Sequence, residues 1–267
     1  MIRSLTVNTR LFFSGAYLSY VALFAWLRPV TYLASKVVGP LMQIVFFALL
    51  GSFATGADTI DFYVIGNAVH VVALSGVFGV SMSIGGDRWN GTLPYLFGTP
   101  ANRLAMFVGR AIIHVLDGMV GVFLGLLWGV LLLGLDLTQT DPGALVMTIL
   151  VTSFSTAGLG LMLGALSLIT VNVMFVNNFV YFALLIFSGT NIPVERLPAW
   201  MQMVSSGLPL TRGLAAARAL IDGASLSSVS GLLVEEFLIG VGYILVGYVF
   251  FRWFELQAKR RGTLDLL

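Results

Sequence analysis

Six long apolar stretches, each close to the length of a bilayer crossing, fill most of the 267 residues. They cover residues 37–53, 62–84, 112–135, 144–169, 171–187 and 232–254. A helix needs about 20 apolar residues to cross a hydrocarbon core about 30 Å thick. Backbone polar groups cannot stay unpaired in lipid, and a helix pairs all of them within one segment. Each of these crossings is therefore predicted to be a helix. We therefore expect an all-α polytopic membrane protein with six transmembrane helices.

Composition supports a single membrane domain over residues 1–267. The chain is 58% hydrophobic and 10% charged, whereas soluble domains carry about 25% charged residues. No hydrophilic stretch is long enough for a separate soluble domain of about 50 residues, which leaves no room for a nucleotide-hydrolysing domain. The absence of cysteine excludes disulfides, thiolate metal sites and cysteine nucleophiles.

The charged residues between the stretches alternate in sign. The basic groups are Arg3, Arg10, Arg28 and Lys36 before the first stretch, Arg88, Arg103 and Arg110 after the second, and Arg252, Lys259, Arg260 and Arg261 after the last. The intervening gaps carry Asp58, Asp61, Asp136 and Asp141. We expect the protein in the inner (plasma) membrane of the cell. The positive-inside rule then places both termini and the segment 88–110 on the cytoplasmic side.

These signals divide the chain into segments. We expect an interfacial helix over 1–28, spans over 30–53, 62–85, 107–135, 144–169, 171–189 and 231–254, a cytoplasmic loop over 86–105, and an outer re-entrant hairpin over 190–224. The first segment is apolar enough to cross, but Arg10 and Ser14 interrupt it and Arg28-Pro29 ends it, which favours a helix lying in the interface. In the hairpin, prolines separate two helical pieces that are each about half the length of a crossing.

Polar residues inside the predicted spans are candidate functional groups. They are Asn67, His70, His114, Asp117, Asn172, Asn177 and Asn178. Asn67/His70 and His114/Asp117 are each three residues apart, so each pair lies on one helix face. Three interpretations stay open: a polar lining of a translocation path, hydrogen bonds between helices worth about 0.6–2 kcal/mol each, or a proton relay from His114 to Asp117. No metal site is expected, since no metal-binding spacing such as HExxH occurs.

Two further patterns are structural. Glycines follow one another at short spacing along the third stretch (Gly118, Gly121, Gly125, Gly129) and the fourth (Gly158, Gly160, Gly164). Such stripes let membrane helices approach closely. Glu235-Glu236 begin the last stretch, and if buried they need partners such as Arg212 or Arg218.

Two motifs, in order, resemble those of the ABC-2 type exporter permeases, the membrane subunits of ATP-binding-cassette exporters. Between the second and third spans, the family pattern is matched by Asp87-Arg88, Gly91-Thr92-Leu93, Thr99-Pro100 and Arg103. After the fifth span it is matched by Ser188-Gly189, Pro193, Leu197-Pro198-Ala199-Trp200, Pro209-Leu210-Thr211 and Arg218. Pro94 stands where the family usually has glutamate, so no role of that glutamate is carried over.

The resemblance implies a half-transporter that pairs with a second permease copy, as a homodimer or heterodimer. A separate nucleotide-binding subunit would bind ATP and Mg, so this chain needs no cofactor, catalytic residue or nucleic acid partner. The family's coupling helix would seat in that ATPase; its segment here contains Asp87, Arg88, Gly91, Thr92, Leu93, Thr99, Pro100 and Arg103. The helix over 1–28 would brace this contact as the connecting helix. The hairpin with Pro193, Pro198, Trp200, Pro209 and Arg218 would close the outer end of the path.

The sparse polarity of the spans favours export of an amphiphile, such as a drug, natural product or lipid. A polysaccharide or lipid-linked glycan exporter of the same family is the alternative, and it needs a wide channel lined with aromatic residues. A membrane-embedded lipid-modifying enzyme would instead use a clustered acid/base set, for which Glu235 and Glu236 with an arginine are the nearest candidates. A purely structural or receptor subunit also stays open. The chain lacks a GxxxxGK[ST] motif, so it is not expected to bind ATP itself.

Overall fold

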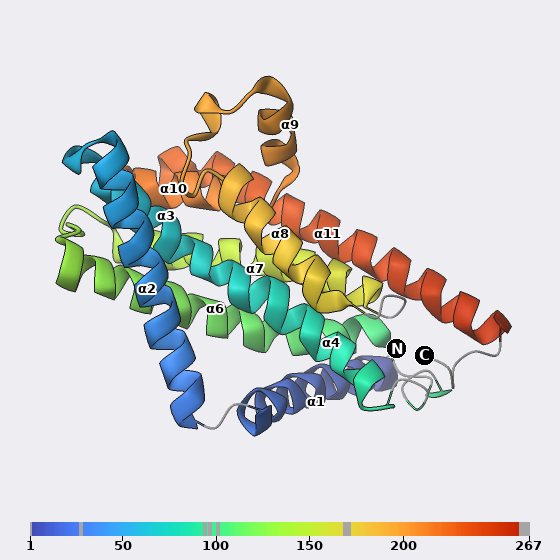
Figure 1. The fold of residues 1–267 in the computed structure, drawn as a ribbon. Coiled ribbons are helices and arrows are strands. Elements are labelled where there is room, and N and C mark those ends of the chain that lie inside the picture. The colour runs from blue at the N-terminus through green and yellow to red at the C-terminus, as the bar shows by residue number, and fades with distance from the viewer. Residues whose placement is uncertain are drawn as a thin grey trace.

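A computed structural model describes residues 2–26, 29–92, 95, 98–99, 102–167 and 172–261. Within these ranges the chain forms helices and no strand, which confirms the all-α prediction (Figure 1). The helices are α1 (Ile2–Trp26), α2 (Pro29–Thr55), α3 (Ile60–Ala73), α4 (Val80–Trp89), α6 (Arg103–Leu133), α7 (Pro142–Leu166), α8 (Val173–Phe187), α9 (Ala199–Gly207), α10 (Thr211–Ile221) and α11 (Leu226–Arg261). A π-helix, η2 (Leu74–Gly79), joins α3 to α4, and the short 3-10 helices η1 (Ala57–Thr59) and η3 (Val194–Arg196) lie in loops.

Five helical runs in the described residues are long and apolar enough to cross a membrane. They are Val30–Thr55, Ala57–Asp87, Ala105–Leu133, Pro142–Leu166 and Leu226–Gln257. The chain is therefore a multi-pass membrane protein. The predicted span over 171–189 corresponds to α8, an apolar helix of 15 residues. Because a crossing needs about 17–25 residues, the count of six spans stays a prediction.

The spans differ in how deeply they lie in the bundle. Each run contains one most apolar window of 18 residues. The share of this window that is buried is 72% in the run from Ala57 to Asp87 and 67% in α7. The corresponding share is 22% in both α2 and α11. Helix α7 packs against α11, α6, α4 and α10, so it forms the centre, whereas α2 and α11 present apolar faces outward.

Glycines permit the close packing of these helices. A Cβ at Gly125 of α6 would lie 3.1 Å from the Cβ of Ala68 on α3. A Cβ at Gly158 of α7 would lie 2.5 Å from the carbonyl oxygen of Gly240 on α11, closer than real Cβ contacts come. Both glycines belong to the predicted stripes, whose role in helix packing is thereby confirmed.

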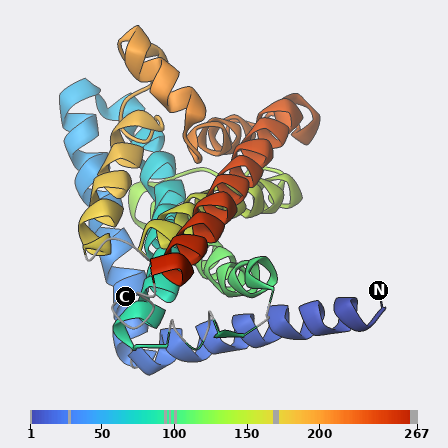
Figure 2. The same cartoon turned by 90° about the vertical axis from the view of Figure 1, so that its right-hand side faces the viewer.

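Helix α1 lies across one end of the bundle rather than along it (Figure 2). It packs against the first turns of α6. A Cβ at Gly15 would lie 2.7 Å from the carbonyl oxygen of Met106, and one at Gly109 would meet the backbone of Phe12. Glycines on both helices therefore make this crossing possible. The helix predicted over 1–28 is present, and its place at the membrane surface stays a prediction.

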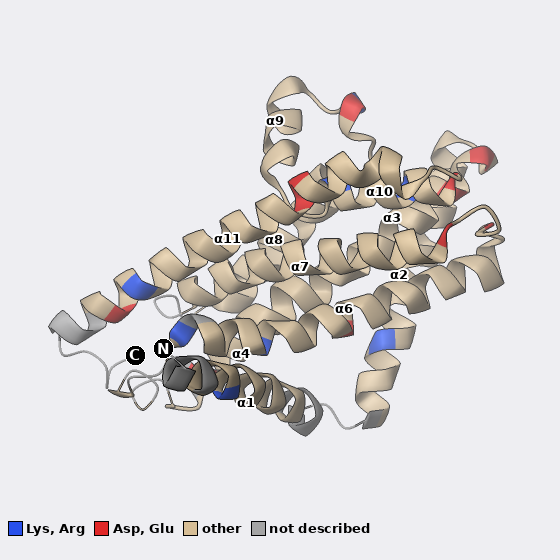
Figure 3. Cartoon of the chain, turned by 180° about the vertical axis from the view of Figure 1, so that it is seen from behind, with Lys and Arg blue, Asp and Glu red and all other residues tan. Residues whose placement is uncertain are grey.

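Most charged residues lie toward the two ends of the bundle (Figure 3). Acidic residues are most frequent near α9 and α10, and the opposite end, near α1 and α4, carries mainly basic residues. This separation agrees with the charge pattern of the sequence, and the apolar middle is the part that lipid would surround.

Candidate functional site

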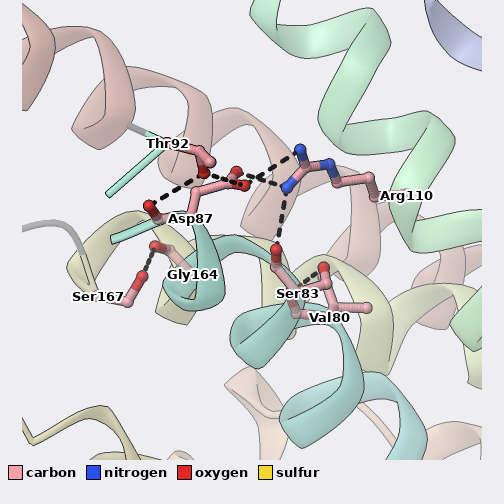
Figure 4. A network of polar contacts seen from close by, with 7 residues as sticks. All are labelled: Val80, Ser83, Asp87, Thr92, Arg110, Gly164 and Ser167. Atoms are coloured by element: carbon pink, nitrogen blue, oxygen red, sulfur yellow. Dashed lines mark hydrogen bonds and ion pairs between the residues drawn. The ribbon is translucent and has the colours of Figure 1, made fainter. Parts of the chain in front are cut away.

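An ion pair fixes the segment that follows α4 at the basic end of the bundle. Arg110 on α6 donates from Nη1 to Asp87 Oδ2 at 2.6 Å and to the carbonyl oxygen of Ser83 at 2.9 Å (Figure 4). The hydroxyl of Thr92 donates to the carbonyl oxygen and to Oδ1 of Asp87, both at 3.1 Å. The amide of Thr92 donates to the same carbonyl oxygen at 2.9 Å. Asp87 thus joins the end of α4, the loop after it and α6.

The loop turns at a glycine, as the motif predicts. Gly91 has φ of 65°, a left-handed conformation that glycine adopts without steric cost. At the other end of the loop, Arg103 donates to the carbonyl oxygen of Thr99 at 2.7 Å and to its hydroxyl at 3.1 Å. Among the predicted coupling residues, Leu93, Pro100 and the side chain of Arg88 lie outside the described residues.

A second charged cluster ties α6 to the end of α11. Glu255 is buried and lies 3.7 Å from Nη2 of Arg103 and 3.1 Å from Nη1 of Arg252. Just inside this cluster, the rings of Phe107 and Phe251 meet edge to face at 4.5 Å. The base of α6 is therefore held by α1, α4 and α11 together, which makes it a firm support for the loop.

The polar residues of the second span join a network near the opposite end. Asn67 donates to Asn191 Oδ1 at 2.8 Å and accepts from Gln43 Nε2 at 3.2 Å. Gln43 also lies 3.3 Å from His70 Nδ1 and accepts from the hydroxyl of Tyr181 at 2.8 Å. This network connects α2, α3, α8 and the loop after α8. The sequence analysis did not list Gln43, although it lies within the first apolar stretch.

Asp117 on α6 has a partner that the sequence analysis placed elsewhere. Lys36 Nζ lies 2.5 Å from Asp117 Oδ2 and 2.7 Å from Ser75 Oγ, and Ser75 donates to Asp117 at 2.6 Å. The hydroxyl of Tyr32 donates to the other carboxylate oxygen. Lys36 was counted among the charges preceding the first apolar stretch, but it lies in the third turn of α2 with 8% of its surface exposed.

The remaining polar residues of the predicted path are separate from these clusters. His114 is buried beside Gly79, and within the described residues neither of its ring nitrogens has a hydrogen-bond partner. Asn177 is buried and donates to Ser81 Oγ at 2.6 Å. Asn178 is exposed and donates to the carbonyl oxygen of Met174. The structure thus pairs Asp117 with Lys36 and leaves His114 outside that cluster.

Arg218 of α10 holds together the segments that meet at the acidic end. Its guanidinium donates to the carbonyl oxygens of Gly189 at 2.9 Å and of Phe62 and Thr190, each at 3.0 Å. It also stacks on the ring of Phe62 at 3.6 Å. Arg218 therefore joins the end of α8, the following loop and the start of α3, and no carboxylate of the described residues is in contact with it.

Glu236 binds α10 from the neighbouring helix α11. Its carboxylate accepts from the backbone amides of Leu210 at 2.6 Å and of Arg212 and Gly213 at 3.2 Å each. It also accepts from the hydroxyl of Ser155 on α7. A carboxylate at these free amides satisfies and stabilises the helix N-terminus. The adjacent Glu235 instead pairs with Arg212 at 2.5 Å near the surface, as expected for one of the two acids.

The predicted hairpin divides into two unlike halves. Pro193 precedes η3, Pro198 precedes α9, and Pro209 lies two residues before the start of α10. Helix α9 projects from the bundle (Figure 1), and its Trp200 is 59% exposed while meeting the ring of Phe187 at 6.3 Å. Helix α10 packs against α3, α7 and α11. The two helical pieces exist, and their insertion into the outer leaflet stays a prediction.

Comparison with known proteins identifies the family. Residues 8–221 match the model of the ABC-2 type transporter family, which spans both motifs described above. The chain is also 28% identical over 201 residues to the daunorubicin resistance ABC transporter permease protein DrrB1 of Streptomyces coeruleorubidus, an alignment that covers 70% of this chain and 67% of that protein. The chain belongs to the ABC-2 type transporter family of membrane permeases.

Proposed function

We propose that this chain is the permease half of an ATP-driven exporter that moves an amphiphilic molecule out of the cytoplasm or the inner leaflet. The observation that carries the proposal is the braced loop after α4. Its start is held by Asp87 and Arg110, and its end by Arg103. Held from both sides, this loop is a suitable lever for a separate ATPase subunit, which would bind ATP and Mg.

The proposed topology has six crossings, with α8 as the fifth. It places both termini, α1 and the loop after α4 in the cytoplasm, and α9 and α10 outside. The basic end of the bundle supports this orientation through the positive-inside rule. With α9 and α10 outside, the contacts of Arg218 and Glu236 would hold the outer end of the path closed.

A second permease copy, identical or different, would complete the transporter. The outward apolar faces of α2 and α11 support this assembly, since 22% of each apolar window is buried in the single chain. Lipid would cover whatever part of these faces the second copy leaves free.

The substrate class follows from the chemistry of the interior. Its described polar groups are mostly neutral amides and hydroxyls engaged with one another, for example Gln43 with Asn67 and Tyr181. The similar permease named for daunorubicin resistance supports a drug-like amphiphile over a long glycan. We therefore take daunorubicin as the probe substrate and a lipid-linked glycan as the competing class.

Transport in inverted membrane vesicles tests the proposal. Vesicles from cells that express this chain together with the genes neighbouring its own should accumulate daunorubicin with ATP, and vanadate should abolish the accumulation. Accumulation of a lipid-linked glycan instead would replace the substrate class but keep the exporter. Absence of any ATP-dependent uptake would contradict the proposed function.

Two glycine variants test the lever within the same assay. Gly91→Ala places a side chain at φ of 65°, which costs about 1 kcal/mol and distorts the turn. Gly98→Ala is the control, because its Cβ would have nothing within 4 Å and its φ is not in the left-handed range. The first variant should hydrolyse ATP with reduced uptake, and the second should behave as the parent. Equal uptake in both would count against the lever.

A further inference from the structure

Three membrane helices meet at one charged cluster, and one of them is π-helical there. Lys36 comes from α2, Asp117 from α6, and Ser75 from the second residue of η2. Lys36 and Asp117 are each 8% exposed, and Ser75 is 3% exposed. Ionisable residues at such depth are costly unless paired, and their partners usually have a functional role.

The cluster lies well inside the span. Asp117 is seven residues beyond Arg110 along α6, which places it about 10 Å deeper than the pair with Asp87. Lys36 is the main polar anchor of α2 at this level, on a helix of which 22% of the apolar window is buried. Loss of the cluster would therefore free both α2 and η2 from α6.

A π-helix can change its register with its neighbours. It contains one more residue per turn than an α-helix, and such segments are often found at functional sites. Conversion of η2 to α-helix would rotate the helix before η2 relative to the helix after it by about 100° and shift it along the axis by about 1.5 Å. Such a change would carry Ser75 away from Asp117.

Glycines along η2 bring its backbone close to α6 and α7, so its register depends on how tightly these helices pack against it. Gly76 faces Thr156 of α7, and Gly79 faces the ring of His114 of α6. The same helical run continues through α4, whose last turn carries Asp87 and leads into the loop. Movement of that loop is thus transmitted along α4 directly to η2.

We propose that Lys36, Asp117 and Ser75 form a latch that holds η2 in its π-helical register and that opens during each transport cycle. These residues are positioning residues: they act through the geometry of the span and need not touch the substrate. The inference rests on the proposed function, because the loop movement that opens the latch is driven by the partner ATPase.

A reversible cross-link beside the latch tests it without altering its charged residues. A Cβ at Gly118 would lie 3.5 Å from the Cβ of Ser75, within the range of about 3.5–4.5 Å that a disulfide requires. The chain has no cysteine of its own, so the double variant Ser75→Cys/Gly118→Cys would form a single defined bond. Because Ser75→Cys itself changes a residue of the latch, the reference rate is the uptake of the reduced double variant, and the single variants Ser75→Cys and Gly118→Cys under the same oxidation show the effect of oxidant without a cross-link.

Oxidation of the double variant should block vanadate-sensitive uptake, and a thiol reductant should restore it. Trapping the complex with vanadate before oxidation should slow cross-linking at least about five-fold, as a coupled conformational change predicts. A cross-linked protein that transports at the rate of its reduced form would overturn the latch, as would equal cross-linking rates in both states. The cysteine-free parent distinguishes failure of the latch from failure of the proposed function. If the parent shows uptake and the cross-link has no effect, only the latch is contradicted. If the parent shows no uptake, both the proposed function and the latch are contradicted.

Charge variants give an independent readout. Lys36→Met and Asp117→Asn should each increase the share of ATP hydrolysis that is not accompanied by uptake. The exchange Lys36→Asp/Asp117→Lys should restore part of the coupling. Ser75→Ala keeps both charges and serves where a charge variant does not fold. The proposal would be contradicted if Ser75→Ala and one of the two charge variants, each tested separately, both showed normal uptake per ATP.

Discussion

Replacing Glu236 by alanine removes the carboxylate that holds α10 to the bundle. The side chain is completely buried, and it accepts hydrogen bonds from three backbone amides and from the hydroxyl of Ser155. Alanine offers none of these acceptors. The variant therefore leaves the amides of Leu210, Arg212 and Gly213 unpaired at the start of α10.

The expected loss follows from these contacts. Hydrogen bonds between membrane helices average about 0.6 kcal/mol each, and bonds to charged acceptors reach about 1.5–3 kcal/mol. Four bonds at about 0.6 kcal/mol give roughly 2.5 kcal/mol, and four at about 1.5 kcal/mol give roughly 6 kcal/mol, so we expect the Glu236→Ala variant to lose roughly 2.5–6 kcal/mol of unfolding free energy. The lower value applies if water reaches the unpaired amides, and the higher value applies if they stay buried.

Glu235→Ala is the matched control, because its side chain is 59% exposed and pairs with Arg212 alone. A surface ion pair of this kind contributes about 0–1 kcal/mol. The assay is unfolding in mixed detergent micelles, followed by helical circular dichroism. A loss below about 1 kcal/mol for Glu236→Ala, or equal losses for both variants, would refute the role assigned to Glu236.

Further predictions concern packing, coupling and topology. Gly158→Ala should lower the unfolding free energy by about 1–3 kcal/mol, because its Cβ would meet a carbonyl oxygen of α11. Gly231→Ala is the control and should not lower it, because there is open space around Gly231. Thermal unfolding distinguishes the two variants. Arg110→Gln should remove the ion pair of Asp87 and reduce uptake per ATP about five-fold or more, while an Arg110→Gln protein that transports normally would contradict this. A cysteine at Glu195 should react with a membrane-impermeant maleimide from outside only; labelling from the cytoplasmic side would reverse the topology.

The long apolar stretches predicted most of the fold, since length and hydrophobicity alone decide whether a helix can cross a bilayer. The glycine stripes of α6 and α7 also indicated helix contacts correctly, because the absence of a side chain has one main consequence in a close-packed bundle. The π-helix η2 has no such signature. Its residues Leu74–Gly79 are as apolar as those of the α-helices around it.

The partners of the buried charges were harder to predict. Lys36 was counted as a charge outside the first apolar stretch because that stretch begins at Val37, although α2 begins two turns earlier at Pro29. Its partner Asp117 is 81 residues away, a distance at which sequence spacing carries no information about contact. Glu236 was expected to need an arginine, but backbone amides hold it instead, and every residue except proline carries such an amide.

Co-purification tests the central claim most directly. The chain would be expressed with the genes that neighbour its own, purified in mild detergent through a tag on the permease, and examined by native mass measurement and ATP hydrolysis. The account predicts a complex with equal numbers of permease and ATPase subunits and vanadate-sensitive hydrolysis. A permease that purifies alone, without bound ATPase and without hydrolysis, would contradict it and would shift attention to Glu235 and Glu236 as candidates for a membrane enzyme.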